Sequence, residues 1–90
     1  MANICIHCMV VGRVQGVWFR ANTLTRAQEL NVTGWVQNTD EGHVEVLVCG
    51  EEAAVETLID WLGKGPPAAR VNNVIRTPKE WEEHSSFVVL

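Results

Sequence analysis

The stretch Thr33–Cys49 reads TGWVQNTDEGHVEVLVC, and it decides the fold of this chain. Residues 33–38 are typical of a short strand, and residues 39–42 have the composition of a turn. In residues 43–49 a valine occupies every second position from Val44 to Val48, as in a strand with one buried face. The stretch therefore predicts a β-hairpin.

A helix is expected before the hairpin, over residues 20–30. Its buried stripe recurs at helical spacing and consists of Phe19, Thr23, Ala27 and Leu30. Asn31 follows the stripe, and asparagine fits the left-handed conformation that often closes a helix.

A second helix is expected after the hairpin. Gly50 is placed to cap this helix, and Glu51 and Glu52 suit the positive end of its dipole. The glycine and two prolines of residues 65–67 stop it. Its apolar stripe consists of Val55, Leu58, Ile59 and Leu62.

Further strands are expected outside the two helices. Residues 4–11 and 71–76 are typical of strands, residues 77–86 of a polar loop, and residues 87–90 of a short edge strand. The order βαββαβ, plus the terminal strand, predicts an α+β fold of the ferredoxin-like, split βαβ type. This fold is an antiparallel sheet with two helices on one face. We expect a single domain over residues 1–90, because a chain of this length supports one small core.

The composition argues against several classes of protein. The chain is 47% hydrophobic and 20% charged, which is typical of globular proteins. Its net charge of −4 lacks the broad basic footprint of a nucleic-acid binder. No apolar run approaches the ~20 residues that span a membrane, and the start of the chain does not have the pattern of a signal peptide. We therefore expect a cytoplasmic protein with no nucleic-acid or membrane partner.

A candidate anion site lies in the stretch Gly12–Arg20, GRVQGVWFR, which joins the first strand to the first helix. Backbone N–H groups at a helix N-terminus have no internal partners, and the helix dipole favours negative charge there. Gly16 lets a ligand approach the backbone, and Arg20 offers a planar fork for two anion oxygens. The alternative is a tight connection whose arginines are only solvated.

Asn38, at the end of the first hairpin strand, is a second candidate site residue. Its neutral amide can orient a water molecule without repelling an anion. The alternative is structural, with Asn38 making a hydrogen bond in the turn that contains Asp40 and Gly42.

The stretch Gly12–Arg20, together with Gly34–Glu45 (GWVQNTDEGHVE), resembles the acylphosphatase family. The spacing of the two blocks and the length of the chain also fit a stand-alone member. The resemblance implies the fold predicted above and the hydrolysis of acyl phosphates, small molecules in which a carboxyl group is joined to phosphate. It implies no metal and no cofactor, and we expect the protein to be a monomer.

The resemblance also implies roles for individual residues. Arg20 corresponds to the family's essential arginine, and Asn38 to the asparagine that positions water. The phosphate loop, whose backbone N–H groups would hold the phosphoryl oxygens or an inorganic phosphate or sulfate, corresponds to Gln15, Gly16, Val17, Trp18 and Phe19. Trp18 is at a variable position, where it is either a hydrophobic wall beside the site or simply exposed.

The cysteines and histidines do not predict a metal centre. Cys5 and Cys8 form a CxxC pair, a spacing also found in metal carriers. In a strand, residues three apart point to opposite faces, so these two thiols cannot bind one ion. His7, His43 and His84 show no ligand spacing.

A disulfide is predicted instead between Cys5 and Cys49 under oxidising conditions. The first and third strands of the predicted sheet are antiparallel neighbours, so Cys5 and Cys49 would lie close together on the face away from the helices. A reducing cytosol would keep most of this pair open. Cys8 would then be a thiol in the core.

Two non-catalytic functions remain as alternatives at this stage. One is a module that only binds anions, because a family member can lose its activity. The other is an RNA-binding ferredoxin-like module, but this class needs exposed aromatic side chains on the central strands and a basic surface. Neither central strand of the predicted sheet contains an aromatic residue.

Overall fold

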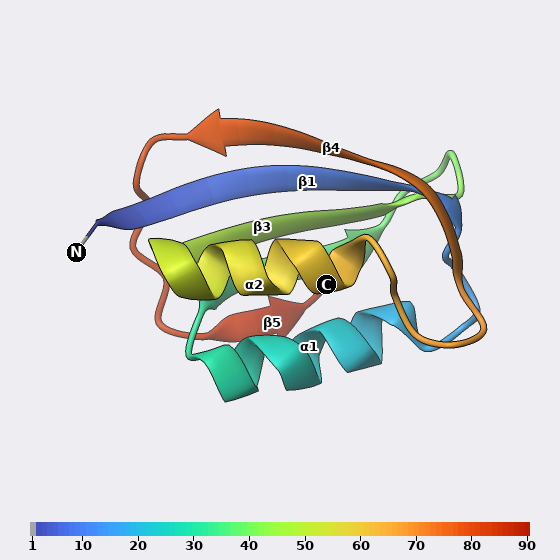
Figure 1. Ribbon diagram of the computed structural model, residues 1–90, viewed down its shortest axis with the longest axis horizontal. Helices are drawn as coiled ribbons and strands as arrows, with labels where there is room; N and C mark the ends of the chain where they lie inside the picture. The colour runs from blue at the N-terminus through green and yellow to red at the C-terminus, as the bar shows by residue number, and fades with distance from the viewer. Residues whose placement is uncertain (1) are drawn as a thin grey trace.

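The computed structural model describes residues 2–90, and the predicted hairpin is present as β2 (Thr33–Asn38) and β3 (Val44–Glu51) (Figure 1). Helix α1 (Phe19–Leu30) precedes it and α2 (Glu52–Leu62) follows it. The remaining strands are β1 (Asn3–Arg13), β4 (Arg70–Lys79) and β5 (Phe87–Val89). The predicted order of elements is confirmed.

The strands form one sheet in the order β4-β1-β3-β2-β5. The pairs β1–β3, β1–β4 and β2–β3 are antiparallel, as predicted. The short strand β5 pairs in parallel with β2, which gives the sheet one parallel edge. This edge matters for the site, because it carries residues 87–90 alongside the strand that ends at Asn38.

Both helices lie on the same face of the sheet (Figure 1). The core between the helices and the sheet is built from side chains at every second position of β3, namely Val44, Val46 and Val48. The stripe predicted for α2 is buried against them and consists of Val55, Leu58, Ile59 and Leu62. Within residues 2–90, no helix is long and apolar enough to cross a membrane.

Three predicted boundaries are wrong. Gly50 does not cap α2, because β3 continues through Glu51, and Glu51 is the residue before the helix. Residues 77–79 belong to β4 and not to a loop, because they continue its antiparallel pairing with β1. Gly12 and Arg13 are the end of β1, after a bulge that follows Val11. The polar composition of these segments hid the pairing that holds them.

The predicted left-handed cap at Asn31 is confirmed. Asn31 has a φ of 57°, and the backbone N–H of Val32 donates to the carbonyl of Ala27 at 3.1 Å. This bond closes α1 and turns the chain directly into β2.

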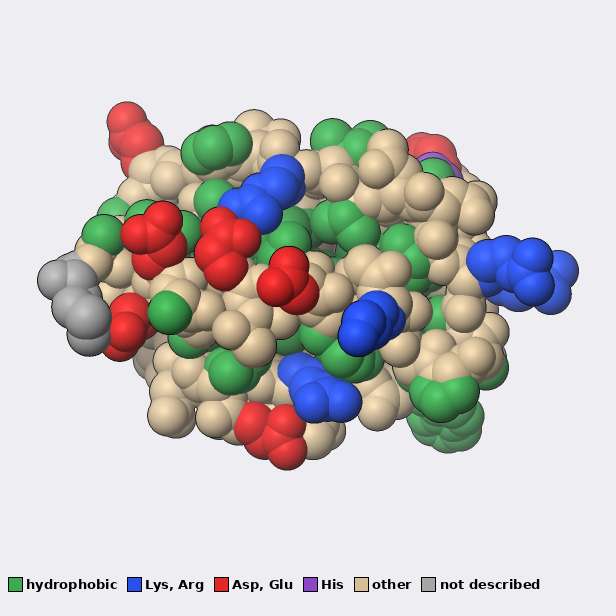
Figure 2. Space-filling model, in the orientation of Figure 1, with side chains coloured by type: hydrophobic (Ala, Val, Ile, Leu, Met, Phe, Trp, Pro, Cys, Tyr) green, Lys and Arg blue, Asp and Glu red, His purple; other side chains and the backbone are tan. Residues whose placement is uncertain are grey.

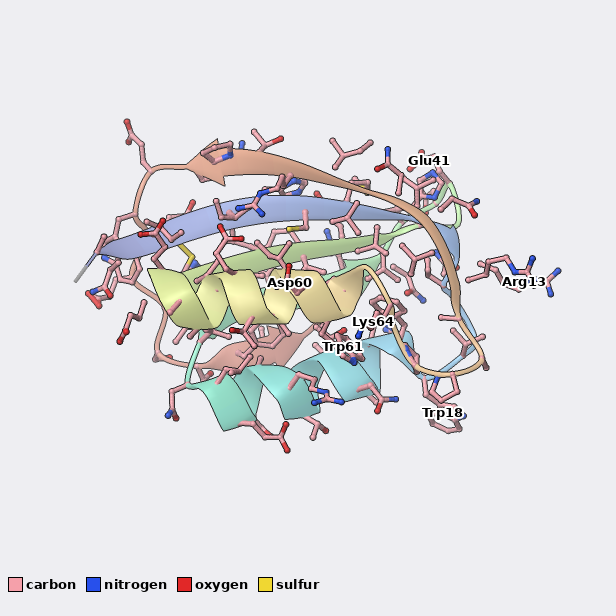
Figure 3. All side chains as sticks on the ribbon, viewed as in Figure 1. Arg13, Trp18, Glu41, Asp60, Trp61 and Lys64 are labelled. Atoms are coloured by element: carbon pink, nitrogen blue, oxygen red, sulfur yellow. A yellow bond between two sulfur atoms is a disulfide. The ribbon has the colours of Figure 1, made fainter. Side chains whose placement is uncertain are left out.

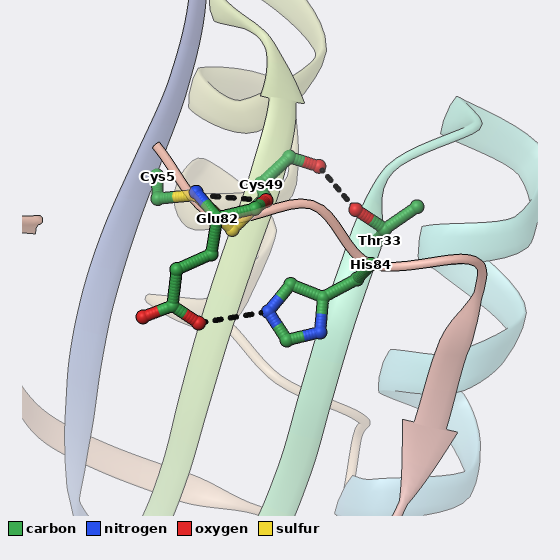
Figure 4. The surroundings of a disulfide bond; sticks show 5 residues. All are labelled: Cys5, Thr33, Cys49, Glu82 and His84. Atoms are coloured by element: carbon green, nitrogen blue, oxygen red, sulfur yellow. Dashed lines mark hydrogen bonds and ion pairs between the residues drawn. A yellow bond between two sulfur atoms is a disulfide. The ribbon is translucent and has the colours of Figure 1, made fainter. Parts of the chain in front are cut away.

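On the face of the sheet away from the helices, Cys5 and Cys49 lie opposite each other in the β1–β3 register (Figure 4). Their Cα atoms are 4.1 Å apart and a disulfide joins their sulfurs. The segment that leads to β5 crosses this face, and the N–H of Glu82 lies 3.3 Å from the Cys5 sulfur (Figure 4). That the bond forms under oxidising conditions stays a prediction.

Cys8 is fully buried in the core between sheet and helices, as expected. Burial raises the pKa of its thiol to about 11, because the thiolate would lose its hydration. A thiol in this environment is chemically inert.

Candidate active site

The candidate phosphate loop, residues 15–19, lies in the connection between β1 and α1 and ends at the first residue of the helix. Gly16 has a φ of 73° and Trp18 a φ of 64°, so left-handed residues stand on either side of Val17. Alternation of this kind turns successive N–H groups toward one concave side of the chain, which is a common anion-binding arrangement. Glycine tolerates this conformation freely, whereas tryptophan adopts it at a cost.

The backbone N–H groups of this loop make no hydrogen bonds among the described residues. In the part of the chain that the structure describes, no hydrogen bond has a backbone donor from Gln15 to Ala21. The first backbone bond of the helix runs from the N–H of Asn22 to the carbonyl of Trp18 at 3.0 Å. Several donors are thus available at the positive end of α1, where a bound anion is favoured.

The side chain of Gln15 ties the loop to the hairpin. Its amide nitrogen donates to the carbonyl oxygen of Thr39 at 2.8 Å and to that of His43 at 2.9 Å. Thr39 directly follows Asn38, so this bridge connects the loop to the strand end that carries the second candidate.

Asn38 is exposed at the end of β2, where it pairs with Val44. The turn after it is closed by Thr39, whose hydroxyl accepts a hydrogen bond from the His43 N–H at 3.1 Å. Among the described residues, the Asn38 side chain has no hydrogen-bond partner. The alternative role considered for Asn38 was a side-chain hydrogen bond within the turn. In the structure Thr39 makes that bond instead.

Arg20 lies in the first turn of α1 and is held from the far end of the chain. One of its guanidinium nitrogens donates to the backbone oxygen of Leu90 at 3.2 Å. Leu90 is positioned in turn by its own N–H, which donates to the carbonyl of Val36 on β2 at 2.8 Å. The contact leaves the other donors of the guanidinium for a ligand.

Five of the seven predicted site residues line one cavity of about 430 Å³. Gly16, Trp18, Phe19 and Arg20 line it from the loop and helix, and Asn38 lines it from the strand. Arg13, the other arginine of the motif, is exposed and projects into solvent away from this cavity (Figure 3). The other two residues predicted for the loop, Gln15 and Val17, are not among those that line the cavity.

Two contributions to the site were not predicted. The side-chain amide of Gln15 was not assigned a role, because only its backbone N–H belongs to the phosphate loop. The contact of Arg20 with the Leu90 backbone oxygen was not assigned, because no side-chain pattern signals a contact made by the backbone.

Comparisons with known proteins agree with this geometry. The sequence model of the family described as Acylphosphatase matches residues 6–89. A Legionella pneumophila protein named Acylphosphatase is 46% identical over 88 residues, which cover 98% of this chain and 97% of that protein. The structure of an acylphosphatase from Coxiella burnetii superposes with a TM-score of 0.94 at 44% identity, covering 98% of this chain and 93% of that one. An acylphosphatase from Bacillus subtilis superposes with a TM-score of 0.93 at 33% identity, covering 97% and 98%.

The chain therefore belongs to the acylphosphatase family. It is a hydrolase that cleaves the carboxyl–phosphate bond of acyl phosphates, which yields a carboxylate and inorganic phosphate. The anion-binding and RNA-binding alternatives are not favoured.

Proposed function

We propose that this hydrolysis takes place in the cavity between the loop of residues 15–19 and Asn38, with Arg20 binding the phosphoryl group. One observation supports the proposal above all. The same cavity is lined by backbone N–H groups and an amide that have no partner among residues 2–90, and by an arginine with further donors to offer.

The loop and Arg20 would bind the phosphoryl oxygens of the substrate. Their N–H groups would neutralise the charge on the equatorial oxygens as the bond to phosphorus breaks. The protein needs little further chemistry, because the carboxylate of an acyl phosphate is already a good leaving group. Position and charge stabilisation therefore account for the rate.

Asn38 would hold the attacking water in line with the bond that breaks. The water oxygen forms a bond to phosphorus, the bond from phosphorus to the carboxyl oxygen breaks, and the carboxylate leaves with the electron pair. The proton of the water passes to the phosphate group of the substrate. Arg20 is the only titratable side chain among the described residues that line the cavity, so no protein group there is suited to act as a base.

The experiment is hydrolysis of benzoyl phosphate by wild type and by Arg20→Ala and Asn38→Ala in excess EDTA. Arg20→Ala should raise KM and lower kcat, because it removes a positive charge that stabilises the bound substrate as well as the transition state. Asn38→Ala should lower kcat by about 10²-fold or more, because it acts on the water and not on substrate binding. Normal kcat in Asn38→Ala would remove it from the proposal.

The matched control for Arg20 is Arg13→Ala, since Arg13 belongs to the same motif but does not line the cavity. Its kcat/KM should stay within about twofold of wild type. A loss as large as that of Arg20→Ala would mean that the overall positive charge near the loop, and not the bound guanidinium, carries the effect.

We also propose that inorganic phosphate or sulfate occupies the loop, that the protein is a monomer without a nucleic-acid partner, and that it acts in the cytoplasm. The first of these follows from the same unpaired N–H groups. Phosphate should therefore inhibit competitively, and Arg20→Ala should weaken that inhibition.

A further inference from the structure

Trp18 is an exposed apolar side chain beside the proposed site. Its exposed fraction is 78%, the largest among the exposed large hydrophobic residues. Figure 3 shows it at the N-terminal end of α1, pointing outward, and Figure 2 shows hydrophobic atoms at that corner of the surface. A single exposed apolar side chain is ordinary on a protein surface, so what distinguishes Trp18 is its place beside the cavity.

The backbone of Trp18 is fixed in a conformation that tryptophan rarely adopts. Its φ is 64°, and its carbonyl accepts two bonds from Asn22, from the N–H at 3.0 Å and from the side-chain amide at 2.9 Å. Left-handed backbone at a bulky residue costs free energy and is commonly found at functional sites. The direction of the Trp18 Cα–Cβ bond relative to the loop is thus fixed by the backbone.

The cavity that holds Arg20 and Asn38 has an apolar wall. Trp18 forms part of this wall together with Ala21 and Leu24 of α1 and Val89 of β5. Val89 is itself 40% exposed, so the wall is open to a ligand. Among the described residues that line the cavity, Arg20 alone is charged.

We propose that this wall, formed by Trp18, Ala21, Leu24 and Val89, binds the acyl group of the substrate and selects acyl phosphates with an apolar, above all aromatic, acyl group. The inference rests on the proposed function, because that function places the phosphoryl group at the loop. The acyl group is covalently attached to the phosphoryl group, so it must lie in the same cavity or at its edge. Trp18 offers a flat ring for an aryl acyl group.

A charged acyl group would gain little from this wall. Arg20 is already engaged by the phosphoryl group and by Leu90, and the wall supplies no second cation and no carboxylate. Placing a charge against Trp18 and Leu24 would cost hydration without a compensating partner. The wall therefore discriminates by burial of apolar surface.

The test compares kcat/KM for benzoyl phosphate with kcat/KM for acetyl phosphate. The wall can bury the phenyl ring of benzoyl phosphate, whereas acetyl phosphate offers it only a methyl group. Trp18→Asn removes the ring, while asparagine keeps the left-handed backbone at little cost. Leu24→Ala shortens the wall from the helix, where no phosphate-binding N–H is involved.

Each variant should lower the ratio of benzoyl to acetyl kcat/KM about fivefold, because it removes part of the apolar contact area. The control is Trp81→Ala, which removes another exposed tryptophan that does not line the cavity and should leave the ratio unchanged. An unchanged ratio in both Trp18→Asn and Leu24→Ala would overturn the proposal. So would an unchanged ratio accompanied by a shift in the sedimentation of Trp18→Asn, because Trp18 would then contact a second copy of the chain.

Arg20→Ala separates this proposal from the one on which it rests. If that variant loses activity on both substrates while the wall variants keep the wild-type ratio, only the acyl-group wall is wrong. If Arg20→Ala keeps its activity on both substrates, the location of the site is wrong, and the wall proposal falls with it.

Discussion

The side-chain amide of Gln15 lies 2.8 Å from the carbonyl oxygen of Thr39, and this contact joins the two halves of the site. One half is the loop after β1 and the other is the end of β2, and they are 24 residues apart in sequence. The same nitrogen donates to the carbonyl of His43 at 2.9 Å, so the hairpin turn is held at both of its ends.

Replacing Gln15 should therefore disturb catalysis without touching a substrate-binding group. Gln15→Ala keeps the backbone N–H of the loop but leaves two carbonyls without their donor. We expect kcat for benzoyl phosphate to fall roughly tenfold and the free energy of unfolding to fall by about 1–2 kcal/mol. Steady-state kinetics and urea denaturation measure the two effects. Gln37→Ala is the control, because the Gln37 amide bonds to Glu45, away from the cavity, and its loss should leave kcat unchanged.

Gly65 packs directly against the ring of Phe19, the last residue of the candidate loop. A Cβ atom on Gly65 would lie 2.6 Å from the Phe19 ring, and the φ of Gly65 is +69°. Gly65→Ala should lower the free energy of unfolding by roughly 2–4 kcal/mol, because strain and overpacking add. Gly42→Ala isolates the strain, since Gly42 has a φ of +90° and open space around it. Its cost should be about 1 kcal/mol, and equal costs for the two variants would exclude the clash.

The disulfide between Cys5 and Cys49 should stabilise the oxidised protein. The two residues are 44 apart in sequence, and closing a loop of this length is worth about 2–4 kcal/mol through the unfolded chain. Urea denaturation with and without a thiol reductant should show this difference. The double variant Cys5→Ala/Cys49→Ala should unfold at the same urea concentration in both conditions. If the urea midpoint of wild type were the same with and without the reductant, the disulfide would not form.

Protonation of Glu45 should make the protein less stable in acid. Hydrogen bonds from His7, at 2.7 Å, and from Gln37 hold the pKa of Glu45 below its ordinary value of 4.5. A carboxyl group with a lowered pKa stabilises the fold above its unfolded pKa, and this contribution is lost as the pH falls through the folded pKa. Wild type should therefore lose its advantage over Glu45→Gln as the pH is lowered below about 4.5. Denaturation midpoints of both proteins across pH 3–7 would measure the loss, and a constant difference would contradict it.

The fold was predictable because its signals are local and periodic. The valines of β3 and the stripe of α2 point to one face at the spacings of a strand and a helix, and the core follows from them. The boundaries were harder. Residues 77–79 are polar, and only their pairing with β1, far away in sequence, makes them a strand. The same holds for the direction of β5, which is set by its neighbour β2.

The parts of the candidate site that depend on side-chain type could be predicted from the sequence. The parts that depend on backbone conformation or backbone contacts could not. Arg20 and Asn38 stand out as residue types, and the structure brings both to one cavity. The conformation of Trp18 has no local signal, since tryptophan is a poor choice for a left-handed position. The bond from Arg20 to Leu90 joins residues 70 apart, a relationship that no spacing in the sequence reveals.

That bond has a consequence for the order of events when the protein is made. Arg20 is synthesised 70 residues before Leu90, whose backbone oxygen holds it, and Leu90 directly follows the strand β5 that pairs with β2. The contact that holds the arginine therefore cannot form until residues 87–90 have been made. Newly made chains should become fully active only once these residues have docked, so the appearance of activity would time that docking.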